Sequence, residues 1–411
     1  MGDSRSLTRG DLAEVVRREG GRVLATLARQ FGSLDVAEDA VQDAVVRALE
    51  KWPETGVPDN PAGWLTTTAK NAARDRLRRS SKRGGKEEQA ATMLMPPRAV
   101  HTESVVHDDL LRLIFTCCHP ALNQDAQVAL ALRTICGLTT AEIAAAFVLS
   151  ESTMAQRLVR AKKKIALARI PYRVPPDEEL RERTAAVLNV IYLLFTEAHH
   201  SSSSDEVYRI DLAEEAIYLG RLVTELMPET AAALGLLALM LATHARRAGR
   251  FDENGTPVLM ADQNRDLWDH DAIAEADELL NRSLRLGSPD PYQLQAAIAC
   301  VHGLAPTAEE TDWQEIVLLY DRLFEMQPSP VVAVNRAIAL AEFEGDEAGW
   351  HALELVDGMD HWHFFHAARA ELLRRMGDSA GARSAYEQAL ACKLGPTDAR
   401  FLEDRLSSLR P

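Results

Sequence analysis

Cations recur along one face of a predicted helix at residues 60–79, and their spacing suits contact with a row of phosphates. Four-residue steps align three cations, with an amide and a carboxylate beside them: Lys70, Arg74 and Arg78, with Asn71 and Asp75. Residues 69–86 hold eight Lys or Arg and one acidic residue. Cations position a protein on a nucleic-acid backbone, whereas amides and carboxylates reach base edges. The dipole of a helix end also favours cations, but it accounts less easily for eight.

A second basic segment is predicted to form two helices joined by a tight turn. TTAEIAAAF (139–147) favours the first helix, VLS (148–150) the turn and ESTMAQRLVRAKKKI (151–165) the second helix. The inward positions of the second helix are Met154, Leu158, Ala161 and Ile165, and the outward ones are Ser152, Thr153, Gln156, Arg157, Arg160, Lys163 and Lys164. This is the spacing of a helix-turn-helix, whose second helix enters the major groove. An ordinary helical hairpin is the alternative interpretation.

A third segment, GSLDVAEDAVQDAVVRALEKWP (32–53), predicts an amphipathic helix with an acidic and amide face. Its apolar stripe consists of Ala37, Ala40, Val41, Ala44, Val45, Ala48 and Leu49. The adjacent face presents Glu38, Asp39, Gln42, Asp43 and Val46. Such a face suits a basic or polar partner helix, although the pattern by itself favours a solvated surface.

The sequence contains none of the usual motifs of enzymatic chemistry: no P-loop, glycine-rich dinucleotide turn, nucleophile elbow or HExxH. Cys117, Cys118 and His119 are adjacent, but neighbouring cysteines rarely both ligate one zinc ion and no CxxC partner lies nearby. We therefore expect no catalytic residue, no metal and no cofactor, in a protein that is not an enzyme.

The elements that must position these residues are predicted to be helical, because apolar residues recur every three or four positions along the chain and no β-hairpin signal is convincing. The expected fold class is all-α. Asn60 is a good N-cap before Pro61 at the first helical position. Three prolines in IPYRVPPDEE (170–179) mark a boundary. Four blocks follow: helical units at 12–82 and 107–169, a linker at 83–106 between them, and a long helical domain at 180–411.

The composition fits a protein of two or three cored domains, with 46% apolar residues in 411. The absence of an 18-residue apolar run and of a signal-peptide pattern, with only five cysteines, leads us to expect a cytoplasmic protein with no membrane partner. Residues 1–169 carry 25 Lys and Arg against 20 Asp and Glu, whereas residues 170–411 carry 21 against 41. Residues 1–169 are therefore expected to contact a polyanion, and residues 170–411 are expected to avoid one.

The C-terminal block has the pattern of paired helices. In AARAELLRRMGDSAGARSAYEQALA (367–391), small and large residues alternate as in a tetratricopeptide helix pair: Ala370, Gly377, Ala382, Tyr386 and Ala389. AVNRAIALAEFEGD (333–346) looks like the preceding repeat and LGLLALMLATHARRAG (234–249) like a degenerate one. A plain Ala-rich helical bundle is the alternative.

The three segments, in this order and spacing, resemble a bacterial RNA polymerase sigma factor of the extracytoplasmic-function (ECF) group in the sigma-70 family. DVAEDAVQDAVVRALEKWP is similar to the region 2.1–2.2 helix, which grips core polymerase, and NPAGWLTTTAKNAARDRLRR to regions 2.3 and 2.4, which open and read the −10 element. The helix-turn-helix is similar to region 4.2, which reads the −35 element. The resemblance covers residues 12–168, and the remainder resembles the long tetratricopeptide-like extension of one subgroup.

The resemblance implies an alternative sigma factor that directs core RNA polymerase to specific promoter DNA and performs no chemistry itself. Polymerase contacts would come from Asp39, Gln42 and Asp43. The −10 element would be read by Trp64, Lys70, Asn71, Arg74, Asp75 and Arg78, and the −35 element by Ser152, Thr153, Gln156, Arg157, Arg160 and Lys163. Trp64 is the only aromatic between residues 54 and 80. A single stacking platform implies weaker duplex opening and a stricter promoter match, and packing in the core is the alternative role for Trp64.

The expected linker has the length that two promoter elements require. Residues 83–106 reach at most about 80 Å, and elements two helical turns apart are separated by about 70 Å. The acidic C-terminal domain would modulate activity or bind a protein or peptide partner. The alternative to a sigma factor is a conventional helix-turn-helix regulator with a helical sensor domain, which leaves residues 32–82 without a role.

Overall fold

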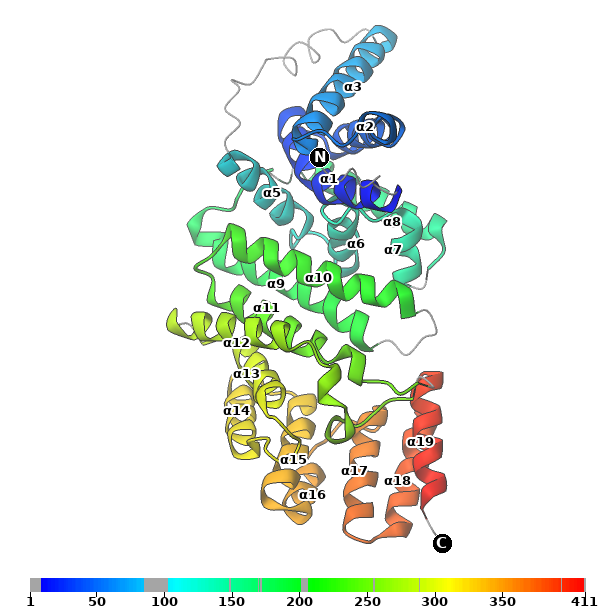
Figure 1. Cartoon of the computed structure of the whole chain (residues 1–411), viewed down its shortest axis with the longest axis vertical. Coiled ribbons are helices and arrows are strands. Elements are labelled where there is room, and N and C mark those ends of the chain that lie inside the picture. The colour runs from blue at the N-terminus through cyan, green and yellow to red at the C-terminus, as the bar shows by residue number, and fades with distance from the viewer. Residues whose placement is uncertain are drawn as a thin grey trace, which may run out of the picture. The chain divides into compact units, whose positions relative to one another are not determined.

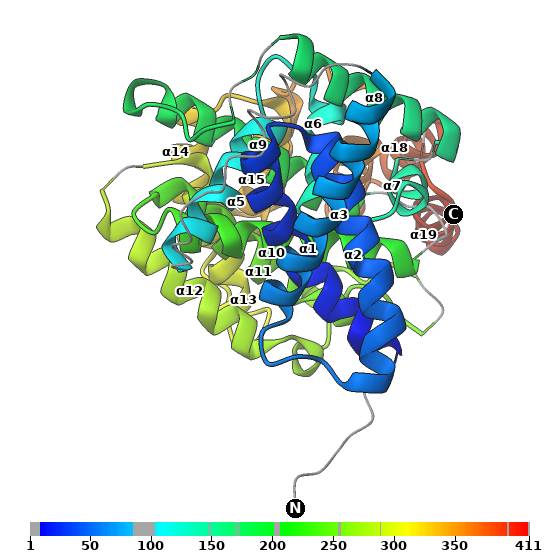
Figure 2. The same ribbon diagram turned by 90° about the horizontal axis from the view of Figure 1, so that it is seen from above.

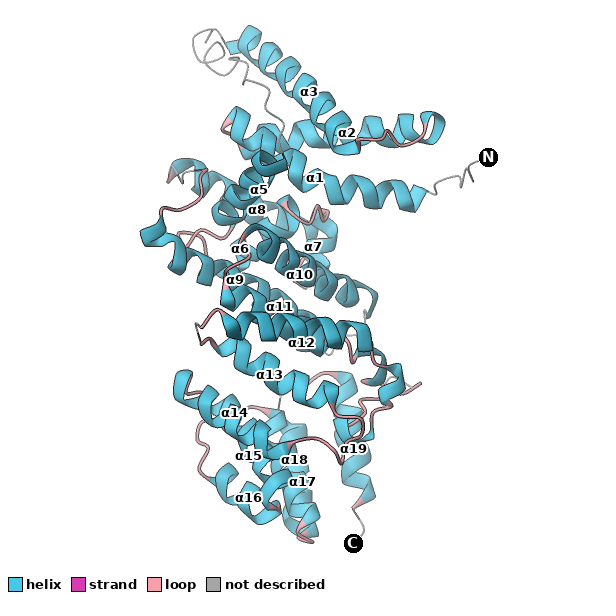
Figure 3. Ribbon diagram, turned by 60° about the vertical axis from the view of Figure 1, so that its left-hand side comes forward, coloured by secondary structure: helices cyan, strands magenta, loops and turns pink. Residues whose placement is uncertain are grey.

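The computed structural model of the chain is built from helices (Figure 1, Figure 3). It describes residues 9–84, 103–147, 149–168, 170, 172–200, 206–253, 256–287, 289–392 and 394–409. Across these ranges the one extended pairing is an isolated bridge between Phe251 and Pro257. The all-α fold class expected from the sequence is confirmed. No described helix is long and apolar enough to cross a membrane.

The chain forms two compact units, which divide between Leu194 and Phe195. This division falls inside helix α9 (Asp177–His200), downstream of the boundary that the prolines of residues 170–179 suggested. The start of α9 belongs to the first unit, because Arg183 donates from Nη2 to the Phe115 carbonyl oxygen at 2.6 Å. The first unit therefore extends past the proline-rich segment.

The first unit opens with three helices that pack on one another (Figure 2): α1 (Arg9–Phe31), α2 (Leu34–Thr55) and α3 (Pro61–Gly84). Ser33 caps α2 by accepting from the Val36 amide at 3.3 Å. Asn60 caps α3 as predicted, because its Oδ1 accepts from the Gly63 amide at 2.8 Å. The predicted stripe of α2 faces the core: Ala37, Ala40, Val41, Ala44 and Ala48 are buried, and Val45 and Leu49 are half-buried.

Helix α3 is longer than the sequence suggested, since it continues to Gly84 rather than ending near Arg79. The added turn consists mainly of Arg, Lys and Ser, which a helix tolerates well. The expected linker at 83–106 therefore overlaps the end of α3 and the start of α5 (Glu103–Cys117). Residues 85–102 of that linker lie outside the described residues.

The second part of the first unit contains the helix-turn-helix. Its helices are α5, α6 (Gln124–Thr134), α7 (Thr140–Ala146) and α8 (Glu151–Leu167). Asn123 caps α6 through its Oδ1, and Ser150 caps α8 by accepting from the Thr153 amide at 3.3 Å. Helix α8 packs on both α6 and α7. The predicted inward face is confirmed for Met154, Leu158 and Ala161, which are buried, and Ile165 is half-buried.

The second unit is an array in which each helix packs on the next along the chain, as in repeat proteins. Three short 3-10 helices lie between α11 and α12. The elements are α10 (Glu206–Leu226), α11 (Ala231–His244), η1 (Arg247–Gly249), η2 (Met260–Asp262), η3 (Arg265–Leu267), α12 (His270–Arg285), α13 (Pro291–Leu304), α14 (Trp313–Met326), α15 (Pro330–Glu344), α16 (Asp346–Glu354), α17 (His363–Arg375), α18 (Ser379–Ala391) and α19 (Pro396–Ser408).

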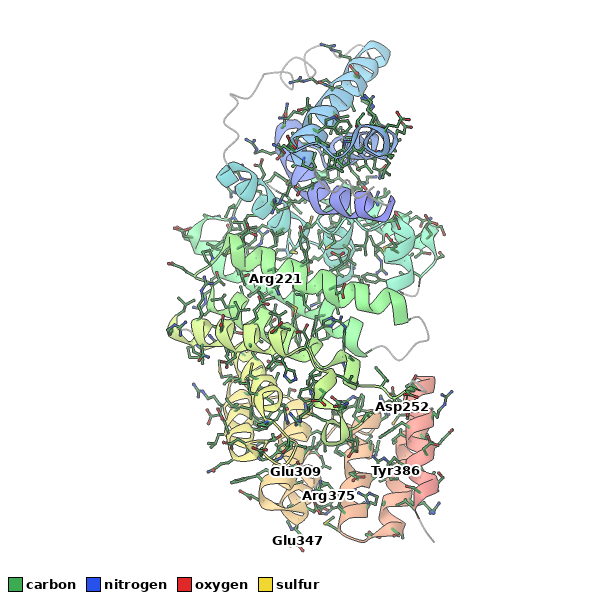
Figure 4. The ribbon with its side chains drawn as sticks, in the orientation of Figure 1. Arg221, Asp252, Glu309, Glu347, Arg375 and Tyr386 are labelled. Atoms are coloured by element: carbon green, nitrogen blue, oxygen red, sulfur yellow. The ribbon has the colours of Figure 1, made fainter. Side chains whose placement is uncertain are left out.

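The pair α17–α18 carries the predicted pattern of small residues around one large side chain. Ala370, Ala382 and Ala389 are fully buried. Tyr386 is buried beside them (Figure 4), and its hydroxyl donates to Glu371 Oε2 at 3.3 Å. Gly377 joins the two helices with φ of +85°, a left-handed conformation that glycine adopts without a steric penalty. The helical pairing is therefore present where the sequence predicted it.

The pair α15–α16 also depends on a glycine, here because there is no room for a side chain between the two helices. Gly349 of α16 lies so close to α15 that a β-carbon there would lie 2.8 Å from the Ala337 carbonyl oxygen and would collide with Ala341. Only a residue without a side chain permits this approach of the two helices.

We expect Gly349→Ala to lower the stability of this pair by about 1–3 kcal/mol, because overpacking a close contact forces the backbone apart. Native-state hydrogen exchange should show faster exchange in α15 and α16. Glu347→Ala, at an exposed position of the same helix (Figure 4), should leave exchange unchanged. Full protection in the Gly349 variant would contradict the close packing.

Candidate nucleic-acid and polymerase interfaces

Helix α8 presents most of the residues expected to read the −35 element. Ser152, Thr153, Gln156, Arg160 and Lys163 are exposed. Arg157 is half-buried, because its Nη1 contacts Asp125 Oδ2 at 3.0 Å and its guanidinium lies 5.5 Å from the centre of the Phe147 ring. The outward face of α8 is therefore polar and cationic, with Arg157 held at its edge.

The first turn of α8 is fixed by its cap. Ser150 Oγ lies 3.1 Å from Ser152 Oγ and 2.8 Å from Thr153 Oγ1, in addition to accepting from the Thr153 amide. Hydroxyl groups held in this way need little further ordering before they contact a phosphate or a base edge.

The side chains of the predicted cation row on helix α3 differ in how exposed they are. Asn71, Asp75 and Arg78 are exposed, whereas Lys70 and Arg74 are half-buried. Burial, followed by the charges of Arg74 and Arg29, lowers the pKa of Lys70. Access to this row is therefore greatest toward the C-terminal end of the helix.

Trp64 lies at the start of α3 against another indole. Its ring makes an edge-to-face contact with Trp52, with centroids 5.4 Å apart. Trp52 is buried and Trp64 is half-buried. This contact supports a packing role for Trp64, the alternative that the sequence left open beside base stacking.

The acidic face of α2 is partly neutralised by a residue that sequence reasoning did not select. Arg76 of α3 forms ion pairs with Asp39 and Asp43, the second at 3.4 Å from Nε to Oδ2. Gln42 is exposed between them. Arg76 is one of the eight cations of residues 69–86 but lies outside the predicted four-residue row. The packing of α3 on α2 brings it to the two carboxylates.

A nearly buried carboxylate joins the two parts of the first unit. Glu38 of α2 has a side chain only 13% exposed and contacts Arg133 Nε of α6 at 2.5 Å and Lys162 Nζ of α8 at 3.0 Å. Lys162 also contacts Asp35 Oδ1 at 2.7 Å. Burial opposes the charge on Lys162, but Asp35 and Glu38 outweigh it and raise the pKa of this lysine. Lys162 thus points at α2, whereas its neighbour Lys163 is exposed.

A second connection lies between α1 and α5. Arg29 Nε contacts Asp109 Oδ1 at 2.7 Å, and Arg112 contacts the same oxygen at 3.3 Å. The Asp109 side chain is fully buried, and burial raises its pKa. The Tyr172 hydroxyl also donates to the Ala25 carbonyl oxygen at 3.4 Å. The three-helix part and the helix-turn-helix part are therefore held by two separate polar clusters.

The cysteines of this unit are structural in character. Cys117 and Cys118 are buried, and Cys117 Sγ lies 3.2 Å from Thr134 Oγ1. Burial raises the pKa of Cys117 to about 12, so the reactive thiolate is scarce at neutral pH. His119 Nδ1 accepts from the Ala121 amide at 3.1 Å. In the part of the chain that the structure describes, no cluster of three metal-ligating side chains occurs.

A helical unit with an acidic helix and a basic helix, followed by a helix-turn-helix, is the arrangement that the resemblance to sigma factors predicts. Comparison with known families agrees. Residues 15–83 match "Sigma-70 region 2" and residues 112–165 match "Sigma-70, region 4". Residues 183–284 match a family of unknown function, DUF6596. No solved structure gives a significant match.

Two kinds of relative are found among known proteins. "Uncharacterized protein R00370" of Rhizobium meliloti (strain 1021) is 40% identical over 97% of this chain and 95% of its own length. "Probable ECF RNA polymerase sigma factor SigI" of two Mycobacterium tuberculosis strains is 30% identical over 154 residues. That match covers 36% of this chain and about half of SigI, at 52%.

The chain belongs to the ECF group of the sigma-70 family and carries a C-terminal extension. It is an alternative sigma factor that directs transcription initiation, and its regions 2 and 4 imply core RNA polymerase and promoter DNA as partners. The resemblance drawn from the three sequence segments is confirmed at this level.

The Glu38 cluster makes a specific prediction about stability. Glu38→Ala leaves Arg133 without its carboxylate and Lys162 with Asp35 alone. Removing one partner of a nearly buried ion pair costs about 3 kcal/mol. Native-state hydrogen exchange should show this loss in α2 and α8.

Glu50→Ala, at an exposed position of α2, is the matched control and should leave exchange unchanged. Equal behaviour of the two variants would show that the cluster does not hold regions 2 and 4 together.

Proposed function

We propose that α2 docks this sigma factor on core RNA polymerase, while α3 reads the −10 element and α8 the −35 element. The observation that carries the proposal is the exposed polar and cationic face of α8, on the capped second helix of a region 4 helix-turn-helix. The proposed polymerase contacts are Asp39, Gln42 and Asp43. The region 2 match gives residues 15–83 the role that a conventional regulator leaves unexplained. We further propose a cytoplasmic protein that catalyses no reaction itself.

For the −10 element we favour the exposed polar side chains of α3. Asn71, Asp75 and Arg78 are exposed, and Lys70 and Arg74 of the same helix are half-buried. Trp64 packs on Trp52, which supports the expectation that few aromatic platforms hold unpaired bases and that promoter matching is strict.

The proposal requires regions 2 and 4 to separate. In the structure Lys162 of α8 contacts Glu38 of α2 directly, whereas promoter elements two helical turns apart lie about 70 Å from each other. The ion pairs of Glu38 and of Asp109 would therefore break as the protein binds a promoter. The separated regions would then be joined by the predicted linker at 83–106, which reaches about 80 Å only when the residues that it shares with the ends of α3 and α5 extend as well.

We propose that the second unit modulates activity or binds a partner. A truncation that tests this role should end after α9, near residue 200, because Arg183 contacts the first unit. In run-off transcription, a gain of activity on truncation would indicate inhibition by the second unit, and a loss would indicate support.

The promoter-reading role predicts a defined result with core polymerase and genomic promoter fragments. Full-length protein should produce new 5′ ends, and Gln156→Ala with Arg160→Ala should reduce them by at least about tenfold, since each base or phosphate contact contributes about 1–3 kcal/mol. Arg181→Ala, which removes an exposed cation outside α3 and α8, should retain them. Stable DNA binding without any defined start, from the full-length chain and from the chain truncated after α9 alike, would favour the conventional regulator instead.

The polymerase-docking role predicts a separate defect. Replacing Asp39 and Asp43 by Ala removes the acidic face of α2 and leaves Arg76 without these partners. Affinity for core polymerase, measured by fluorescence anisotropy, should fall by at least about tenfold, as for a charged hot spot. Replacing Glu50 and Glu54 by Ala, two exposed acids of the same helix, is the control. An equal fall in both variants would place the contact elsewhere.

A further inference from the structure

A groove runs along α13 in the second unit, between α12 and α14. It encloses about 690 Å³. Each helix contributes one row of residues at helical spacing: Asp277, Leu280, Asn281 and Leu284 from α12, Leu294, Ala297, Val301 and Leu304 from α13, and Glu315, Leu319, Arg322 and Met326 from α14. Helix α13 packs on α11, α12 and α14, and the residues that it contributes between α12 and α14 form the floor.

The floor of the groove is apolar and partly open to solvent. Leu284 and Leu304 are 55% and 53% exposed, although both line the same concave surface. Leu294, Val301 and Leu319 are half-buried beside them. Contiguous exposed apolar surface with a polar rim is typical of an interaction site.

The groove has an acidic rim. Five carboxylates are among its lining residues; Glu310, Asp312 and Glu315 are exposed, and Asp277 and Asp290 are half-buried. Asp290 and Asp312 cap α13 and α14, by accepting from the amides of Tyr292 and Glu315. In the described ranges no cation pairs with any of the five, and the one cation of the lining, Arg322, contacts Glu325 at 2.6 Å. The rim thus attracts positive charge.

We propose that this groove binds a cationic amphipathic helix of a partner protein. A helix is about 10–12 Å across, and one with Leu-like anchors at i, i+3, i+4 and i+7 would place them on the floor and its Lys or Arg at the rim. A second copy that docks through its own second unit is disfavoured, since residues 170–411 carry 41 acidic against 21 basic residues. The chain's own basic run at 69–86 has Leu77 as its only large apolar residue and lacks the anchors.

This inference deepens the partner role proposed for the second unit and does not depend on promoter reading. It is tested by binding alone, without polymerase or DNA, so its failure and that of the sigma-factor proposal are distinguishable. The probe is a fluorescent helical peptide of Leu and Lys with Leu at i, i+3, i+4 and i+7, added to the full-length chain. We expect micromolar affinity that weakens with salt. Replacing every Lys by Glu, or scrambling the Leu spacing, should abolish binding.

Variants of the groove localise the site. Leu304→Arg and Glu315→Lys should each weaken binding by at least about tenfold, as expected for central contacts. The matched controls are Leu318→Arg on α14 and Glu278→Lys on α12, which are exposed but lie outside the groove and should keep the affinity. The proposal is overturned if the Leu/Lys peptide does not bind, if the scrambled peptide binds equally well, or if groove and control variants behave alike.

Discussion

The carboxylate of Glu38 is the point on which the arrangement of the first unit depends. It is nearly buried and pairs with Arg133 and Lys162, and it is the carboxylate that these two cations share. A buried charge is tolerated only when it is paired. The same pairing ties region 2 to the second helix of the helix-turn-helix. In the proposed promoter-bound state these ion pairs would break, and polymerase and DNA would supply the free energy that separates the two regions.

A related coupling exists inside region 2. Arg76 of the basic helix α3 pairs with Asp39 and Asp43 of the acidic helix α2. The proposed polymerase face and the helix proposed to read the −10 element therefore share charges. A polymerase cation that approached Asp39 would compete with Arg76 and release it. If α2 and α3 have the roles proposed above, docking on polymerase and presentation of cations to DNA would be linked through the Arg76 guanidinium.

The helices of the second unit are held together differently from those of the first. Small residues such as Ala370, Ala382 and Gly349 permit its helices to approach closely, around large buried side chains such as Tyr386. Apolar side chains that are not used in these contacts, including Leu284 and Leu304, remain at the surface of one groove. With acidic side chains around that groove, the unit is suited to the cationic partner proposed for it. On these proposals, the chain would bind a polyanion through the first unit and a polycation through the second.

The sequence by itself determined the all-helical class, the cap at Asn60, the buried stripe of α2 and the outward face of α8, because these depend on residues within a few positions of one another. The paired helices around Tyr386 were predictable for the same reason. Only the tertiary structure decided that Arg76 faces Asp39, that Lys162 rather than Lys163 turns to Glu38, and that the first unit includes the start of α9. Those outcomes join residues 37 to 124 positions apart. Helical periodicity does not encode which face of one helix meets another, since several faces of a charged helix are equally compatible with its local pattern.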